Sequence, residues 1–202
     1  FSSENRNFIS TKYNNINILT NLEKLLDTEI SLIKYDIKSI EKKFFDEANR
    51  LLPKNNYVGF SITQGNEYRK KTWSVGKFIS IAKKLKEFNK QPVFFVEKKY
   101  SQLINKIKME VENVIFPELE SHLSGPPLVT ALSSKLEKAI TIDNGVMHMM
   151  SLANIPMVIL FGPTNSKKFA PKKNNINILD SKILYNSKDI SKITEEDVLN
   201  LI

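Results

Sequence analysis

Residues 139–161 read AITIDNGVMHMMSLANIPMVILF, and the pattern of this stretch indicates the fold class. An apolar run at 139–142 leads into the turn Asp143-Asn144-Gly145, a helical stretch at 145–153 and a second apolar run at 156–161. Both apolar runs are too continuous to leave one face in water, which is typical of strands buried in a parallel sheet. The stretch therefore predicts a strand, a crossover helix and a second, parallel strand.

The same alternation extends in both directions from this unit, over residues 57–202. We expect strands at 57–62, 92–96, 113–116, 139–142, 156–161 and 176–179. We expect helices at 75–88, 98–110, 127–137, 145–153 and 194–202, the last opened by Thr194 and Asp197 in capping-box spacing. Repeated strand–helix units with right-handed crossovers predict an α/β, Rossmann-like, doubly wound parallel sheet with strand order 3-2-1-4-5-6.

The pattern changes character before residue 56. Residues 1–15 are polar and rich in Asn, which predicts a loop. Thr20 and Glu23 have the spacing of a capping box and predict a helix at 20–28, alternation at 30–35 predicts a strand, and a helix at 39–52 precedes Pro53. The chain opens without an initiator Met or a signal-peptide pattern, and we interpret this start as a truncation.

Composition narrows the class of protein. The 202 residues carry a formal charge of +8, with 41% hydrophobic and 26% charged residues, values of an ordinary folded domain. No Cys is present, which excludes disulfides and thiolate metal sites and favours a cytosolic location. The longest apolar stretch, 155–161, is far below the roughly 18 residues of a membrane span.

The positive charge favours solvated helix faces over a nucleic-acid surface. Of the 30 basic residues 27 are Lys, in scattered pairs, whereas nucleic-acid sites depend on Arg and stacked aromatic residues. Weak attraction to an anionic membrane surface stays open as an alternative.

Two loops are candidates for a ligand site because of where the topology puts them. Strand 57–62 should lie beside strand 139–142 at the switch point, where ligands bind beyond the carboxyl ends of the strands. Loop 63–72 offers the hydroxyl, amide and cationic groups that a pyrophosphate needs, and an exposed basic loop is the alternative. In loop 143–146, Asp143 or Asn144 can cap the next helix and Gly145 lets a ligand approach the backbone; an ordinary turn is the alternative.

Other catalytic and nucleotide-binding signatures are absent. Two distant histidines cannot assemble a metal site, so we expect no metal, and we interpret His148 as a packing residue rather than a catalyst. Gly59 and Gly65 do not form G-x-G-x-x-G, residues 162–168 lack the second Gly of a P-loop, and no G-x-S-x-G is present.

Four segments, in order, carry a likeness to a known family. Residues 143–148 resemble the Asp-(Thr/Ser)-Gly-Pro-x-His turn of glycosyltransferase family 9, the ADP-heptose:lipopolysaccharide heptosyltransferases, with Asn144 and Val146 as departures. Residues 155–164 are similar to the family's strand and Phe-Gly-Pro-Thr loop, residues 71–74 to its Lys-x-Trp-Pro, and residues 193–199 to its terminal helix. The resemblance covers residues 52–202 and the family's carboxy-terminal half.

The resemblance implies the C-terminal domain of a GT-B glycosyltransferase. Residues 53–202 would be the nucleotide-sugar-binding domain, and residues 1–52 the tail of the acceptor domain and a linker. It implies inverting, metal-independent transfer, without a cofactor, of heptose or a related sugar from an ADP-sugar to lipopolysaccharide core. The site would be cytoplasmic, with peripheral association with the inner membrane. In the family the catalytic carboxylate precedes the region matched here, so we expect donor binding with little or no turnover.

The resemblance also implies roles for individual residues. Ser61 and Thr63 would contact the diphosphate, Lys71 would neutralise it and stabilise the leaving group, and Glu97 would bind the ribose or the adenine edge. Asp143, Asn144 and Gly145 would hold the sugar and phosphate. A second hypothesis is a non-catalytic nucleotide-sugar-binding module, which the departures at Asn144 and Val146 support; a third, a nucleic-acid-binding domain, would need Arg and aromatic residues on one face.

Overall fold

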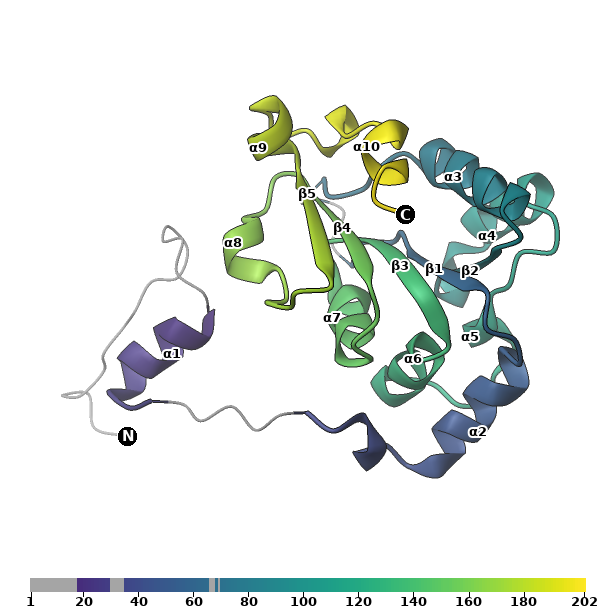
Figure 1. Cartoon of the computed structure of the whole chain (residues 1–202), viewed down its shortest axis with the longest axis horizontal. Helices are drawn as coiled ribbons and strands as arrows, with labels where there is room; N and C mark the ends of the chain where they lie inside the picture. The colour runs from purple at the N-terminus through teal and green to yellow at the C-terminus, as the bar shows by residue number, and fades with distance from the viewer. Residues whose placement is uncertain (1–17, 30–34, 66–67, 69) are drawn as a thin grey trace.

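A computed structural model describes residues 18–29, 35–65, 68 and 70–202, and it contains one parallel sheet (Figure 1). The strands are β1 Tyr57–Ser61, β2 Gln91–Phe95, β3 Leu136–Ile142, β4 Met157–Phe161 and β5 Ile176–Asp180. They pair in the order β2-β1-β3-β4-β5, all parallel. The predicted α/β, Rossmann-like fold class is confirmed, and β1 lies beside β3 at the switch point as expected.

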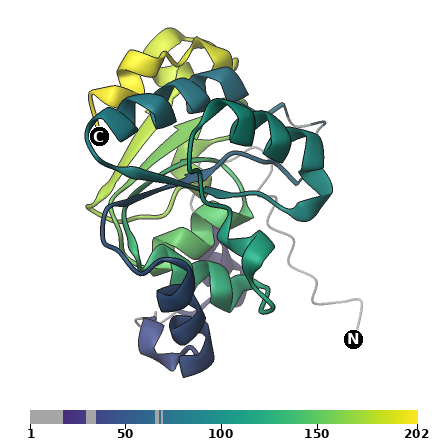
Figure 2. The same ribbon diagram turned by 90° about the vertical axis from the view of Figure 1, so that its right-hand side faces the viewer.

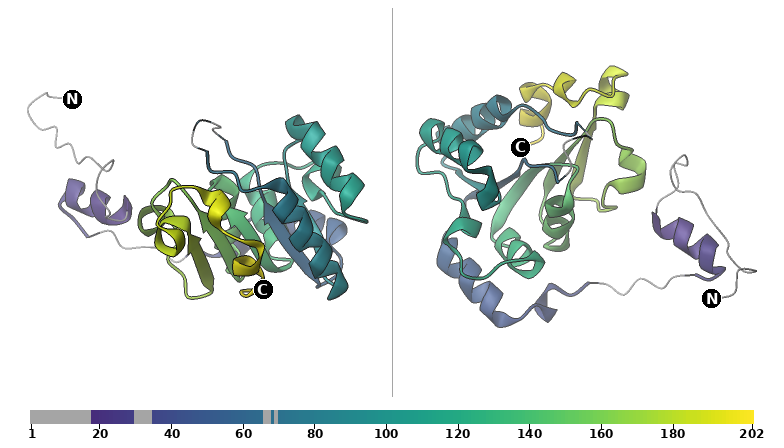
Figure 3. Two further views of the ribbon diagram at one scale, coloured as in Figure 1. Left: turned by 90° about the horizontal axis from the view of Figure 1, so that it is seen from above. Right: turned by 180° about the vertical axis from the view of Figure 1, so that it is seen from behind.

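Helices cover both faces of the sheet (Figure 2). One face packs against α3 Val75–Glu87, α4 Ser101–Glu110 and α10 Glu195–Leu199, and the other against α2 Lys42–Leu51, α6 Pro126–Ser133 and α7 Gly145–Leu152. Shorter helices are α1 Ile18–Leu26, α5 Pro117–Glu120, α8 Ser166–Phe169 and α9 Ser181–Tyr185, with 3₁₀ turns η2 Ile37–Ser39, η4 Lys98–Tyr100 and η5 Ile190–Lys192. Figure 3 shows that α1 belongs to neither layer.

Two hydrophobic cores result, because every residue of β1 and β4 is buried and neighbouring side chains point to opposite faces. Phe60 stacks on Phe94 with ring centroids 4.6 Å apart and meets the edge of Phe78, forming the centre of the α3 side. Burial of this kind stabilises by about 25 cal/mol per Å² of apolar surface. The continuous apolar runs of the sequence thus correspond to strands with no wet face.

The predicted third strand, 113–116, is wrong. Ile115 makes an isolated bridge to Val93 instead of a ladder, so the described sheet has five strands rather than six. Asn113 adopts a left-handed φ of 53°, and Pro117 starts α5, which leaves too few extended residues between them for a strand. The segment still lies beside β2, where the predicted strand order puts it.

Several predicted boundaries change. The helix predicted at 127–137 ends at Ser133, where Ser133 Oγ donates back to the carbonyl of Val129, and β3 already begins at Leu136. The capping box of Thr194 and Asp197 is confirmed. That of Thr20 and Glu23 is wrong, because α1 begins before Thr20. The loop predicted at 1–15 and nearly all of the strand predicted at 30–35 lie outside the described residues; Tyr35 is not in a strand.

Helix α2 is tied to the loop after α5 by a buried carboxylate. Glu47 is 8% exposed and accepts hydrogen bonds from the Arg50 guanidinium, two at 2.8 Å, and from Ser121 Oγ at 2.7 Å. These bonds, led by those of Arg50, lower the pKa of Glu47 to about 2. The segment before β1 is therefore fixed to the domain by a charge-assisted contact as well as by apolar packing.

Candidate functional site

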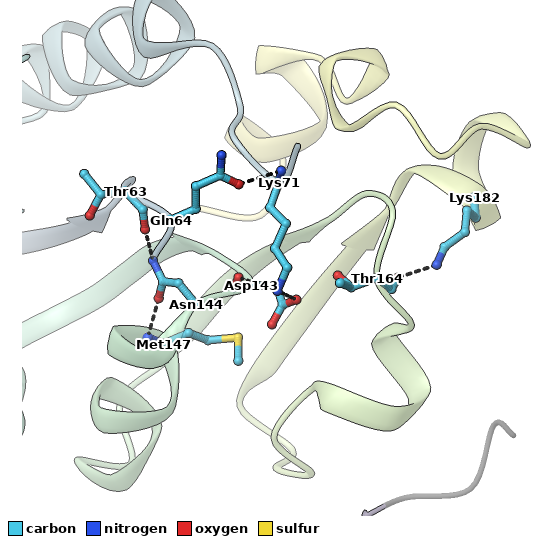
Figure 4. Close-up of polar contacts among 8 residues, drawn as sticks. All are labelled: Thr63, Gln64, Lys71, Asp143, Asn144, Met147, Thr164 and Lys182. Atoms are coloured by element: carbon cyan, nitrogen blue, oxygen red, sulfur yellow. Dashed lines mark hydrogen bonds and ion pairs between the residues drawn. The ribbon is translucent and has the colours of Figure 1, made fainter. Parts of the chain in front are cut away.

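A pocket of about 390 Å³ lies beyond the carboxyl ends of β1 and β3. Its wall is formed by two segments distant in sequence and by one aromatic residue from α8: Gln64, Gly65, Lys71, Asp143, Asn144, Gly145, His148 and Phe169. Gln64, Gly65 and Lys71 of the first loop therefore face the corner at 143–145 across one cleft, as the topology predicts (Figure 4).

Lys71 and Asp143 form a buried ion pair in this pocket. Lys71 Nζ lies 2.5 Å from Asp143 Oδ2 and 3.3 Å from the Asp143 carbonyl oxygen. The two side chains are 11% and 7% exposed, so removing one partner would leave a charge with little solvation. An ammonium has three N–H donors. Lys71 can thus keep both contacts to Asp143 and still donate to a ligand in the pocket.

The backbone at Lys71 is held from both sides. Gln64 Oε1 accepts from the Lys71 N–H at 2.8 Å, and Tyr100 donates its hydroxyl to the Gln64 carbonyl at 3.3 Å. Two residues further on, Trp73 is 2% exposed and its Nε1 donates to the Ile193 carbonyl at 2.9 Å. The cation at the pocket wall is therefore carried by a segment that is anchored at each end.

Asn144 is the N-cap of α7, which resolves the choice between Asp143 and Asn144. Its Oδ1 accepts from the Met147 N–H at 2.8 Å, and its Nδ2 donates to Ser61 Oγ at 2.8 Å and to the Thr63 carbonyl at 2.9 Å. The same side chain thus starts the helix and joins the end of β3 to the end of β1. Asp143, which does not cap, is directed to Lys71.

The structure brings four of the seven predicted site residues to the pocket and leaves three outside its lining. Lys71, Asp143, Asn144 and Gly145 line it. Ser61 is fully buried behind it, and Thr63 lines a neighbouring hollow of about 320 Å³ with Trp73 and Tyr100. Glu97 has a 60% exposed side chain and pairs with Lys99 at 2.8 Å. The ligand roles of these residues stay predictions.

Sequence reasoning missed three pocket residues and assigned another to packing. Gln64 and Gly65 lie in the loop it singled out, but the turn of Gln64 towards the Lys71 N–H has no sequence signal. Phe169 comes from α8, which follows β4 and was not predicted. His148 could have been found, because it stands three residues after Gly145 and so shares its helix face.

The sequence suggested that His148 is a packing residue, but its side chain is exposed and lines the pocket. Partial burial of the ring lowers the pKa of His148, the nearby Asp143 carboxylate opposes that shift, and Lys71 adds to it. The lowered pKa of His148 favours the neutral imidazole, in which one nitrogen can donate and the other can accept.

Two glycines leave open space in the pocket. A Cβ built on Gly145 or on Gly65 would meet no atom of the described residues within 4 Å. The φ angle of Gly145 lies outside the left-handed region, so its backbone does not demand glycine either. The packing of the described residues does not account for a glycine at position 145, whereas a ligand that approaches the start of α7 does.

Within the described ranges, no group of three or more His, Asp or Glu side chains could hold a metal ion.

The parallel sheet, with Lys71 and the start of α7 facing each other at its switch point, defines an α/β, Rossmann-like domain of the GT-B type. The model of glycosyltransferase family 9 (heptosyltransferase) matches residues 17–199, and the chain belongs to this family. The family resemblance inferred from residues 52–202 is thus confirmed.

Solved structures of similar fold include the glycosyl transferase family 9 protein from Veillonella parvula DSM 2008, with 21% identity, a TM-score of 0.71, and 90% of this chain matched to 56% of that one. E. coli ADP-heptose lps heptosyltransferase II shows 19% identity and a TM-score of 0.63 over 80% of this chain and 50% of its own. E. coli heptosyltransferase WaaC with ADP shows 13% identity and a TM-score of 0.64 over 90% of this chain and 53% of its own. The chain therefore spans about half the length of these relatives. Among curated proteins, none matches it in sequence.

Proposed function

We propose that this chain is the donor-binding half of a glycosyltransferase that transfers heptose, or a related sugar, from an ADP-sugar to lipopolysaccharide core. The observation that carries the proposal is the pocket at the switch point, in which Lys71 and Asp143 face the open backbone of Gly145. Family membership supports sugar transfer, and two of the similar structures are named as complexes with ADP and with ADP-2-deoxy-2-fluoro heptose.

The proposed reaction is an inverting displacement at the anomeric carbon. The acceptor oxygen forms a bond to this carbon as the carbon–oxygen bond to the diphosphate breaks, and the electron pair leaves with the phosphate. Lys71 stabilises the developing negative charge, and the start of α7 adds the partial positive charge of its N–H groups. Asp143 fixes the ammonium, so little reorganisation is needed during the reaction.

The acceptor's proton requires a general base, which by resemblance belongs to an acceptor domain preceding the matched region. We accordingly propose that residues 53–202 bind the donor and that residues 1–52 are the tail of the acceptor domain and a linker. No metal or cofactor has a step in this mechanism. Lipopolysaccharide core as the acceptor fits a cytoplasmic site with peripheral attachment to the inner membrane. In the part of the chain that the structure describes, no helix is long and apolar enough to cross a membrane.

Calorimetric titration of the chain with ADP, ADP-heptose and a UDP-sugar tests the donor class. We expect ADP and ADP-heptose to bind and the UDP-sugar to bind more weakly. The same titration of Lys71→Ala tests the cation of the pocket, and its matched control is Lys90→Ala, which removes a lysine whose partner, Glu137, lies 2.5 Å away and which does not line the pocket. Binding of UDP-sugars without binding of ADP would refute the ADP-sugar assignment.

A second candidate function is a non-catalytic nucleotide-sugar-binding module. The observation that favours it is Asn144, because its carboxamide is engaged within the chain by three hydrogen bonds and replaces the hydroxyl usual in the family. A sugar-transfer assay on a longer form that includes an acceptor domain separates the two functions. Donor binding without transfer would favour the module.

A further inference from the structure

We propose that Asn144 is a positioning residue that holds the Lys71 ammonium in place through a closed ring of contacts, rather than a residue that contacts the donor itself. The ring consists of Asn144, Thr63, Gln64, Lys71 and Asp143, and we call it the clamp (Figure 4). The inference deepens the proposed function and rests on it where it concerns the nucleotide.

The orientation of the Asn144 carboxamide is fixed by its partners. The Thr63 carbonyl can only accept, so the group 2.9 Å from it must be Nδ2. The Met147 N–H can only donate, so the group 2.8 Å from it must be Oδ1. Nδ2 also donates to Ser61 Oγ at 2.8 Å, which accounts for both of its hydrogens. The side chain is therefore committed to the protein, and its carboxamide has no further N–H to offer a phosphate.

The ring closes through residues adjacent in sequence. Asn144 holds Thr63, and the next residue, Gln64, accepts from the Lys71 N–H at 2.8 Å. Lys71 in turn donates to Asp143, which precedes Asn144. Loop 63–72 is thus joined to the corner at 143–144 at two points, one through the amide and one through the ion pair. Loss of the amide link removes one of these two connections between the loops.

An Asn can make this link and a Ser or Thr cannot. The hydroxyl of Ser or Thr can replace Oδ1 as the helix cap. It has one hydrogen instead of two and ends one bond closer to the backbone, so it cannot also reach both Ser61 and Thr63. A hydroxyl residue at position 144 would therefore keep the helix cap and lose the clamp.

Two substitutions of Asn144 test the clamp by ADP titration. Asn144→Thr keeps the cap and removes both Nδ2 donations without adding charge. Asn144→Asp keeps the shape and the cap but presents a carboxylate to the Thr63 carbonyl; once protonated, the carboxyl can again donate to one side and accept on the other. Two intramolecular hydrogen bonds are together worth about a 5- to 150-fold factor in an equilibrium constant, and only the part that displaces Lys71 is felt in ADP affinity.

We expect both variants to bind ADP about tenfold more weakly than the unmodified chain at about pH 7.5. Relative to the unmodified chain at the same pH, we expect Asn144→Asp to begin to recover as the pH falls towards about 4, near the ordinary pKa of an Asp carboxyl, whereas Asn144→Thr does not. The control is Asn175→Asp, because Asn175 Nδ2 donates to the Asn154 carbonyl at the opposite end of the sheet. Full affinity in Asn144→Thr overturns the proposal, even if Asn144→Asp is impaired, because the defect would then come from charge alone.

A readout without nucleotide separates the clamp from the proposed function. In amide NMR spectra, Asn144→Thr should shift the Gln64 and Lys71 signals and leave the Met147 amide protected from exchange, because the cap is kept. Unchanged Gln64 and Lys71 signals refute the clamp whether or not ADP binds. Shifted signals in a chain that fails to bind ADP refute the proposed function and leave the clamp standing. Melting curves set the temperature so that every variant is folded.

Discussion

Replacing Gly145 by Ala should separate ligand binding from folding. Among the residues that the structure describes, a methyl group at this position would meet no atom within 4 Å, and the residue's φ is compatible with alanine. Gly145 is the first residue of α7, where alanine has the higher helix propensity. We therefore expect the free energy of unfolding to stay the same or to rise by at most about 1 kcal/mol.

Binding of ADP should respond in the opposite direction. The new methyl group would occupy the pocket beside Lys71 and Asp143, where we place the diphosphate. Forcing one extra carbon into a packed contact costs about 1 to 3 kcal/mol, which corresponds to a roughly 5- to 150-fold loss of affinity. Urea denaturation measures the first quantity and isothermal titration calorimetry the second.

Two other glycines provide controls. Gly76 lies at the start of α3, outside the pocket lining, and a Cβ there would come no closer than 3.6 Å to Ser74 Oγ, so Gly76→Ala should alter neither folding nor binding. Gly59 lies within β1, where a Cβ would stand 2.5 Å from Leu136 Cδ1, so Gly59→Ala should destabilise the fold. An unchanged ADP affinity in Gly145→Ala would refute our placement of the ligand at the start of α7, and a loss of stability would show that the glycine is structural.

Two further predictions concern charged residues. Lys71→Ala should weaken ADP binding by about 1 to 3 kcal/mol and lower the free energy of unfolding, since Asp143 stays buried without its partner; calorimetry showing full affinity would remove Lys71 from the site. Glu47→Gln should destabilise the chain near neutral pH and progressively less below pH 4.5. Arg50 and Ser121 lower the pKa of Glu47 from 4.5 to about 2, so the stability that its ionisation contributes is lost as the pH falls through that range. Urea denaturation at a series of pH values measures this difference, and a gap between the two proteins that does not narrow on acidification would contradict the assigned cause.

The fold was largely predictable because its strands are apolar on both faces. Ile140 and Ile159 lie in continuous apolar runs, and such runs separated by helical segments admit few arrangements other than a parallel sheet. The strand expected at 113–116 failed because propensity there is overridden by the left-handed turn at Asn113. Helix ends such as that at Ser133 depend on side-chain bonds back to the backbone, which periodicity does not report.

The site was predictable as far as topology alone determines it. Lys71 and Asp143 follow adjacent strands at the switch point, so their proximity follows from strand order. Side-chain direction does not follow from strand order. Ser61 belongs to β1 and is buried, although its neighbours in the loop line the pocket, and Gln64 turns to its own loop's backbone. Phe169 depends on a short helix whose length is below what hydrophobic periodicity can resolve.

The hydrogen bond of Trp73 makes the segment around Ile193 part of the support of the site. Its indole N–H donates to the Ile193 carbonyl, and Lys77 Nζ donates to the same carbonyl at 2.6 Å and to that of Ser191 at 2.7 Å. Residues about 120 positions downstream thereby hold the backbone segment that carries Lys71. A substitution at residues 191–193 that displaces these carbonyls would therefore alter the support of the Lys71 pocket, although the residues that line this pocket are all distant from that segment in sequence.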